Sequence, residues 1–228
     1  MRTLKVHSSQ RTIRGFHSKY FSSSLSSCDP CFFPEEEFEA KSLCEKFFGR
    51  VLHPHEFAAL CGCSPTDILQ TVVGTNQHRL YLEFHAKDAD CVGTCLIDAD
   101  SNSRLVLFNE HVRFLNQEKL GRRKFQWFSK QKKACERLGI SAVHMLAAKS
   151  SISQGYRYYP LMGFNADLPQ DFRRRFLPDD YNTQTLHDLL DKPDFWNLWI
   201  TLGTQIEVTF EMKPYSRSQM IFNQNFIP

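Results

Sequence analysis

Hydrophobic and polar residues alternate along short stretches in the first half of the chain, and this alternation predicts β-strands. Leu80, Leu82 and Phe84, for example, alternate with Tyr81 and Glu83, as in a strand with one buried face. Turn-forming residues separate four such stretches, and connections this short favour neighbouring antiparallel strands. The four predicted strands are residues 68–73, 79–84, 91–97 and 104–115.

The fourth predicted strand leads into a strand–helix–strand unit. A turn that ends at Gly121 is followed by an amphipathic helix over residues 122–138 and by an apolar strand over residues 141–147, parallel to the first strand. Phe128 lies on the apolar side of this helix, and Lys124 is expected on the polar side. Because a helix start carries unpaired backbone N–H groups and the positive end of the helix dipole, the residues around Gly121 form a candidate anion site.

The pattern as a whole predicts an α/β (α+β) protein, with a mixed, mostly antiparallel sheet flanked by helices. Residues 1–33 are basic and rich in serine and are predicted to form a flexible tail, although organelle transit peptides have a similar composition and that interpretation stays open. Residues 34–168 form the predicted core, and residues 169–228 form a C-terminal helix and strand extension that packs on it. The other predicted elements are helices at 35–48, 55–61, 183–191 and 193–203, a strand at 205–212, a linker or short turn at 171–178 and partly irregular structure at 213–228.

Composition, charge and cysteine spacing limit the classes of protein to which this chain can belong. The chain has 228 residues, of which 42% are hydrophobic and 23% are charged, which is typical of a globular protein with a substantial core. Its net charge of +3 is too small to indicate nucleic acid by itself, and no apolar run is long enough for a membrane span. Among the eight cysteines, Cys28 and Cys31 have no second C-x-x-C partner, so no metal site is predicted. Reduced, mostly buried thiols in a cytoplasmic protein are expected.

The turn before the predicted helix contains the first of two short motifs. Gly121 occupies the last position of the pattern Gln/Arg-x-x-Gly-x-Gly/Ala, and Asn116 occupies the first. Lys119 stands where this pattern has its middle glycine, so the match is partial, and the lysine adds a cation at the turn.

The second motif follows the next predicted strand. Tyr159 is separated by three residues from the pair Gly163 and Phe164, in the pattern Tyr-x-x-x-Gly-Phe. Together with the order of the elements, the two motifs resemble the GNAT superfamily of N-acetyltransferases over about residues 60–168.

This resemblance implies an acyl-CoA-dependent N-acyltransferase, which transfers an acetyl group from acetyl-CoA, its co-substrate, to an amine of unidentified structure. In the family, the strand before the turn aligns the pantetheine arm, the turn binds the CoA diphosphate, and a tyrosine protonates the leaving thiolate, which makes Tyr159 the candidate acid. Glu110 is the candidate base, preferred to His111 because strand alternation places Glu110 on the face of Val112 and Phe114. The candidate cofactor-binding residues are Val112, Arg113, Phe114, Lys119, Leu120, Gly121, Arg122 and Arg123.

Two other functions stay open on the sequence. A GNAT-like chain that has lost catalysis would be a binding or scaffold protein, and the change at Lys119 favours this alternative. Ala58 and Gly62 have the spacing of a helix-turn-helix nucleic-acid-binding unit, but the segment after them is poor in arginine and lysine, which disfavours nucleic acid. Trp196 and Trp199 could close the acceptor side of the site or fill a homodimer interface. The expected partners are therefore an acyl-CoA and an amine acceptor, without a membrane.

Overall fold

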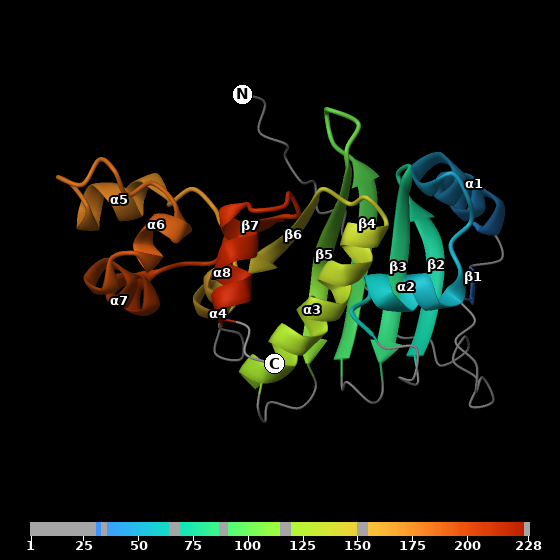
Figure 1. The fold of residues 1–228 in the computed structure, drawn as a ribbon, viewed down its shortest axis with the longest axis horizontal. Coiled ribbons are helices and arrows are strands. Elements are labelled where there is room, and N and C mark those ends of the chain that lie inside the picture. The colour runs from blue at the N-terminus through green and yellow to red at the C-terminus, as the bar shows by residue number, and fades with distance from the viewer. Residues whose placement is uncertain are drawn as a thin grey trace.

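The computed structural model describes residues 31–32, 36–63, 69–86, 91–114, 120–149 and 155–225, and within them seven strands form one sheet (Figure 1). The strands are β1 (Cys31–Phe32), β2 (Leu69–Asn76), β3 (Arg79–Ala86), β4 (Cys91–Ala99), β5 (Leu105–Phe114), β6 (Ala142–Ala147) and β7 (Ile206–Glu211). They lie side by side in sequence order. The β1–β2 and β5–β6 pairs are parallel and the other neighbours are antiparallel, so the predicted mixed, mostly antiparallel sheet is confirmed.

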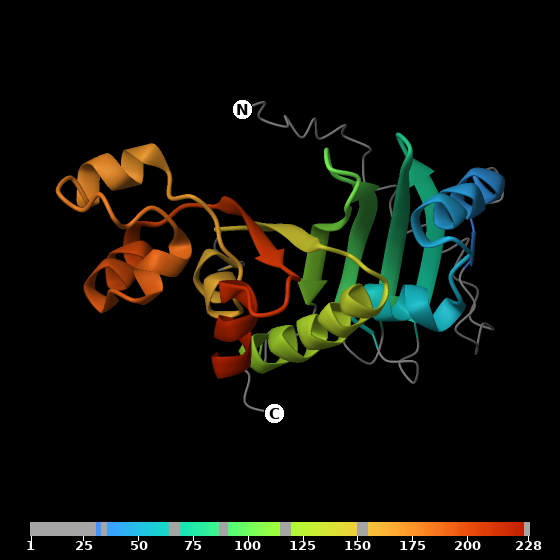
Figure 2. The same ribbon diagram turned by 45° about the horizontal axis from the view of Figure 1, so that its top comes forward.

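Helices pack on one face of this sheet, and others lie beyond its β7 end. They are α1 (Glu37–Phe48), α2 (Pro54–Leu60), α3 (Leu120–Arg137), α4 (Gly155–Leu161), α5 (Gln170–Phe176), α6 (Leu186–Leu190), α7 (Pro193–Leu202) and α8 (Arg217–Asn225). Figures 1 and 2 show α2 and α3 lying across the same face, whereas α5, α6 and α7 gather beyond β7. The β5–α3–β6 crossover is the predicted strand–helix–strand unit, and its two strands are parallel as expected.

The core between α3 and the sheet is built from aromatic rings. Phe128 of α3 has its ring centroid 4.7 Å from that of Phe164, 5.0 Å from that of Phe210 in β7 and 5.6 Å from that of Phe222 in α8. All four side chains are buried. Residues of the predicted core (34–168) and of the predicted C-terminal extension (169–228) therefore pack together around α3. Burial of the rings is the main source of stability of this shared core.

Helices α5 and α8 lie in segments that the sequence pattern predicts to be a linker and partly irregular structure. The segment expected to be a linker or short turn at 171–178 contains α5, in which Phe172 and Phe176 are four residues apart and pack against each other. Phe172 also packs on Trp199 of α7, so this tertiary contact supports a helix that three consecutive arginines obscure in the sequence. Residues 213–228, expected to be partly irregular, contain α8, which buries Ile221 and Phe222.

Candidate functional site

The parallel strands β5 and β6 are paired over only part of their lengths. Their pairing runs from Val106 and Ala142 to Asn109 and Met145, while β5 continues to Phe114. On the other side of β5, Asn109 pairs with Cys95 of β4 and His111 pairs with Thr94, so Glu110 is an additional residue in a β-bulge. Such bulges bend a strand and redirect its side chains. The strands thus part at the bulge, and among the described strands β5 has no partner on its β6 side after Asn109.

A buried pair of amides holds α3 over the last paired residue of β5. Gln131 of α3 donates from Nε2 to the Asn109 Oδ1 at 3.0 Å and to the Leu60 carbonyl oxygen at 2.7 Å. Asn109 donates from Nδ2 to the Gln131 Oε1 at 2.8 Å, and the Cys95 thiol donates to Asn109 at 3.1 Å. Gln131 is completely buried and Asn109 nearly so. The network joins α2, α3, β4 and β5 beside the bulge.

The first half of α3 covers β5 beyond the point where β6 has parted from it. One turn before Gln131, Trp127 packs edge-on against Phe114, with ring centroids 5.9 Å apart. Its indole Nε1 donates to the Cys61 carbonyl oxygen at 2.8 Å. Gly62 makes this approach possible, because a Cβ there would lie 2.3 Å from the Trp127 Nε1. The indole therefore fixes the start of α3 over the free part of β5.

Lys124, one further turn toward the start of α3, is buried instead of lying on the polar side of the helix as predicted. Only 6% of the residue is exposed. Its Nζ lies 5.0 Å from the ring centroid of Tyr158 and 5.7 Å from that of Tyr159, both in α4. Burial lowers the pKa of its ammonium group. The spacing to Trp127 and Phe128 explains the error, because residues three and four apart share a helix face.

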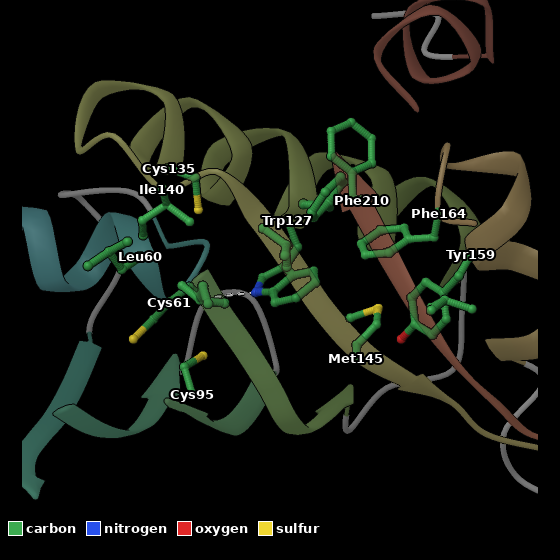
Figure 3. Close-up of a cluster of buried hydrophobic side chains, with 14 of the residues drawn as sticks. Leu60, Cys61, Cys95, Trp127, Cys135, Ile140, Met145, Tyr159, Phe164 and Phe210 are labelled. Atoms are coloured by element: carbon green, nitrogen blue, oxygen red, sulfur yellow. Dashed lines mark hydrogen bonds between the residues drawn. The ribbon is translucent and has the colours of Figure 1, made fainter. Parts of the chain in front are cut away.

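Tyr159 lies beside Lys124, with its ring in the core and its hydroxyl at the divergence of the strands. The ring packs against Phe164, and Figure 3 shows the hydroxyl directed toward Met145, the last residue of β6 that pairs with β5. No described residue forms a hydrogen bond with this hydroxyl. Burial, with a smaller contribution from Cys91, raises the Tyr159 pKa to about 12, so the hydroxyl keeps its proton at neutral pH.

The glycine of the Tyr-x-x-x-Gly-Phe motif has a structural role. Gly163 has a φ of +89°, and a Cβ there would lie 2.2 Å from the Ser218 carbonyl oxygen in α8. The His187 ring contacts the Gly163 carbonyl oxygen at 3.0 Å, while Phe164 enters the aromatic core. The motif therefore fixes the chain that leaves α4, and this packing directs Tyr159.

The predicted base lies in the bulge. Glu110 and His111 are both exposed, and the additional residue interrupts the alternation from which Glu110 was assigned to the face of Val112 and Phe114. Desolvation by the surrounding protein nevertheless raises the Glu110 pKa, whereas the positive charge of Arg79 acts in the opposite direction. A proton acceptor with a raised pKa thus stands where β5 leaves β6.

The predicted cofactor-binding residues fall into three groups. Lys119 lies outside the described residues, as does Asn116 of the same motif, and Leu120 begins α3 without a described side chain. Gly121 is already in the first turn of α3, where a Cβ would meet nothing within 4 Å. The other five are on β5 and α3: Val112 is half-buried, Arg113 is exposed, Phe114 is buried, Arg122 is exposed and Arg123 is half-buried.

A second carboxyl group with a raised pKa escaped the sequence reasoning. Glu83 of β3 is 7% exposed and accepts a hydrogen bond from the Tyr81 hydroxyl at 3.2 Å. Burial raises its pKa, and this hydrogen bond opposes the shift. Glu83 pairs with Thr94, which in turn pairs with His111, so the carboxyl belongs to the same row of the sheet as the bulge. The alternation of β3 had indicated only an outward-facing residue.

The described cysteines are structural. Cys44, Cys61, Cys63, Cys91, Cys95 and Cys135 are free and buried, and Figure 3 shows three of them within the core cluster. Burial raises the pKa of Cys44 to about 11, which makes its thiol a poor nucleophile. Within the described ranges no group of three or more His, Cys, Asp and Glu side chains could hold a metal ion. No helix in the same ranges is both long and apolar enough to cross a membrane.

In comparisons with known proteins, no protein-family model matches the chain and no curated protein sequence matches it.

Proposed function

We propose that the chain is an acyl-CoA-dependent N-acyltransferase of the GNAT type, which transfers an acetyl group from acetyl-CoA to an amine. One observation carries this proposal: β5 and β6 part at a bulge beside Asn109, which is bonded to Gln131 of α3, and the Tyr159 hydroxyl is directed toward Met145, where the pairing of the two strands ends. The arrangement brings the free edge of β5, the helix that covers it and a proton donor together around one position.

Each part of acetyl-CoA has a matching feature in this arrangement. The pantetheine arm is extended and contains amide groups, so it can pair with the edge of β5 after Asn109 as an additional strand would. The diphosphate is an anion, and the start of α3 provides backbone N–H groups, a favourable dipole and the cations Arg122 and Arg123. A thioester carbonyl between these two anchors would lie near Tyr159.

The side chains around this position suit acyl transfer to nitrogen. An attacking amine must lose a proton, and the raised pKa of Glu110 brings this carboxylate closer to the value at which a general base is most effective. Tyr159 keeps its proton at neutral pH and can donate a hydrogen bond, or the proton itself, to the departing sulfur. Because Glu110 must be ionised to accept a proton, activity should rise with pH through its pKa.

The nucleic-acid alternative gains no support from the fold. A helix-turn-helix unit needs a second helix after the turn at Gly62, yet Leu69–Asn76 forms β2. The φ of +73° at Gly62 and its close approach to Trp127 account for this glycine through packing against α3.

The proposal is tested by measuring the release of free thiol from acetyl-CoA with a panel of amines. Tyr159→Phe should lower kcat by about 100-fold and leave the KM for acetyl-CoA unchanged. The variant should fold normally, because no described residue is bonded to the hydroxyl. Tyr215→Phe is the matched control, since Tyr215 is 92% exposed and belongs to neither motif.

The outcomes separate the competing interpretations. Equal kinetics for wild type and Tyr159→Phe would remove Tyr159 from the mechanism. Binding of acetyl-CoA without turnover on any amine would favour the inactive binding or scaffold protein. Absence of binding would exclude both GNAT-type functions.

A further inference from the structure

Lys124 is a buried cation for which the described residues provide no charged counterpart. The described residues include no carboxylate paired with it, and desolvation is the only cause that shifts its pKa. Its neighbours in α4, Tyr158 and Tyr159, offer ring faces, which attract an ammonium group but do not neutralise it. Among the described residues, the Cys91 thiol also acts here, because it contributes to the raised pKa of Tyr159.

A position of this kind is costly to maintain for structure alone. Burying an ammonium group without a counter-charge opposes folding, and a methionine of similar length would fill the same volume without that cost. Trp127 and Phe128 already attach this part of α3 to the core, so the lysine is not needed as an anchor. An anionic ligand atom would remove the cost and would explain the charge.

We propose that Lys124 receives the negative charge of the coenzyme A thiolate as it leaves the acyl group. This inference rests on the proposed function and deepens it, because it assigns a residue outside the predicted set to the leaving group. The geometry separates Lys124 from the phosphate-binding residues: Arg122 is exposed at the start of α3, whereas Lys124 is buried beside Tyr159. We therefore assign the strongly hydrated diphosphate to the exposed cations at the start of α3, and the sulfur to the buried Lys124.

The step is balanced by groups that are present. The amine nitrogen bonds to the acyl carbon and gives its proton to the Glu110 carboxylate. The carbon–sulfur bond breaks, and its electron pair stays on sulfur. The ammonium of Lys124 stabilises this thiolate while the Tyr159 hydroxyl donates a hydrogen bond to it. The proton that Glu110 took from the amine then returns through solvent to the sulfur, which completes coenzyme A and restores the Glu110 carboxylate.

The test is a pH titration of coenzyme A bound to the intact protein. The ionisation of its thiol is monitored by the ultraviolet absorbance of the thiolate. In the wild type, the thiol pKa should fall by about one to two units relative to free coenzyme A, as expected beside a cation. Lys124→Met should abolish the fall, and Lys124→Arg, which keeps the charge, should retain most of it. Lys133→Met is the matched control, because it removes an exposed cation from the same helix and should behave as wild type.

A parallel titration with desulfo-coenzyme A distinguishes the roles. Lys124→Met should weaken binding of the coenzyme A thiolate and leave the affinity for desulfo-coenzyme A unchanged. An equal loss for both ligands would assign Lys124 to the phosphates and overturn the inference. An unchanged thiol pKa in Lys124→Met would also overturn it, while the proposed cofactor site would stand. If coenzyme A binds to none of the proteins, the proposed function fails, and the role of Lys124 fails with it.

Discussion

The amide pair of Asn109 and Gln131 allows a quantitative test of how the bulge is held against α3. Gln131→Met removes the partner of the Asn109 amide and of the Leu60 carbonyl oxygen, and all these groups lie in the core. Each buried polar group left without a partner costs about 1–3 kcal/mol, so this variant should lose about 2–4 kcal/mol of unfolding free energy. Asn109→Leu removes two of the three hydrogen bonds of the Gln131 amide, leaves the bond to the Leu60 carbonyl oxygen, and should cost a similar amount.

The double variant provides the decisive comparison. When both amides are replaced, neither leaves the other unpaired, so the double variant should be more stable than the sum of the single effects predicts by about 1–3 kcal/mol. Urea unfolding followed by tryptophan fluorescence measures these values, and Gln126→Met on the exposed face of α3 is the control, expected within about 0.5 kcal/mol of wild type. Additive single effects would refute the reasoning, because they would mean that the two side chains act independently.

Two further predictions concern a strained glycine and a buried carboxyl group. Gly163→Ala should cost about 2–4 kcal/mol in a urea titration, because it combines a positive φ with a Cβ 2.2 Å from a carbonyl oxygen. Gly139→Ala, which has a φ of +71° and open space, should cost only about 1–2 kcal/mol, and equal losses would contradict the role of the close contact. The raised pKa of Glu83 means that the unfolded chain releases this proton at lower pH than the folded chain, so folded stability falls as pH rises through that window. Glu83→Gln should therefore be more stable than wild type at pH 7 and lose this advantage near pH 4, whereas a constant difference across pH would contradict the assignment.

The sequence pattern predicts elements where hydrophobic periodicity carries the information. The helix expected at 122–138 is α3, Leu120–Arg137, and the strand expected at 79–84 lies within β3, because each buries one regular face. The bulge at Glu110 leaves no such trace, since one additional residue interrupts alternation without changing composition.

Only part of the candidate site could be predicted from the sequence. Tyr159 could be proposed from a motif, and the position of its hydroxyl is consistent with that hypothesis without testing it. The spacing of Lys124 from Trp127 and Phe128 places it on the buried face of α3, but the tyrosine rings next to its ammonium group lie more than thirty positions later in the chain, where no local pattern indicates them. The burial of Glu83 was not predicted for a related reason. The alternation of β3 assigns this residue to a face of the sheet but does not show whether that face is covered.

The central claim, that the start of α3 and the free edge of β5 bind a CoA thioester, is tested most directly by calorimetric titration with acetyl-CoA. We expect saturable binding by the wild type and a loss of affinity of at least about tenfold, or ~1.4 kcal/mol, in Gly121→Asp, where a carboxylate meets the diphosphate. Because a Cβ at Gly121 has open space and an acidic residue suits the first turn of a helix, this variant should fold at least as well as wild type. Gly121→Ala adds the Cβ without the charge and should lose far less affinity. Absence of binding by the wild type, or equal affinities for the Asp and Ala variants, would contradict the account.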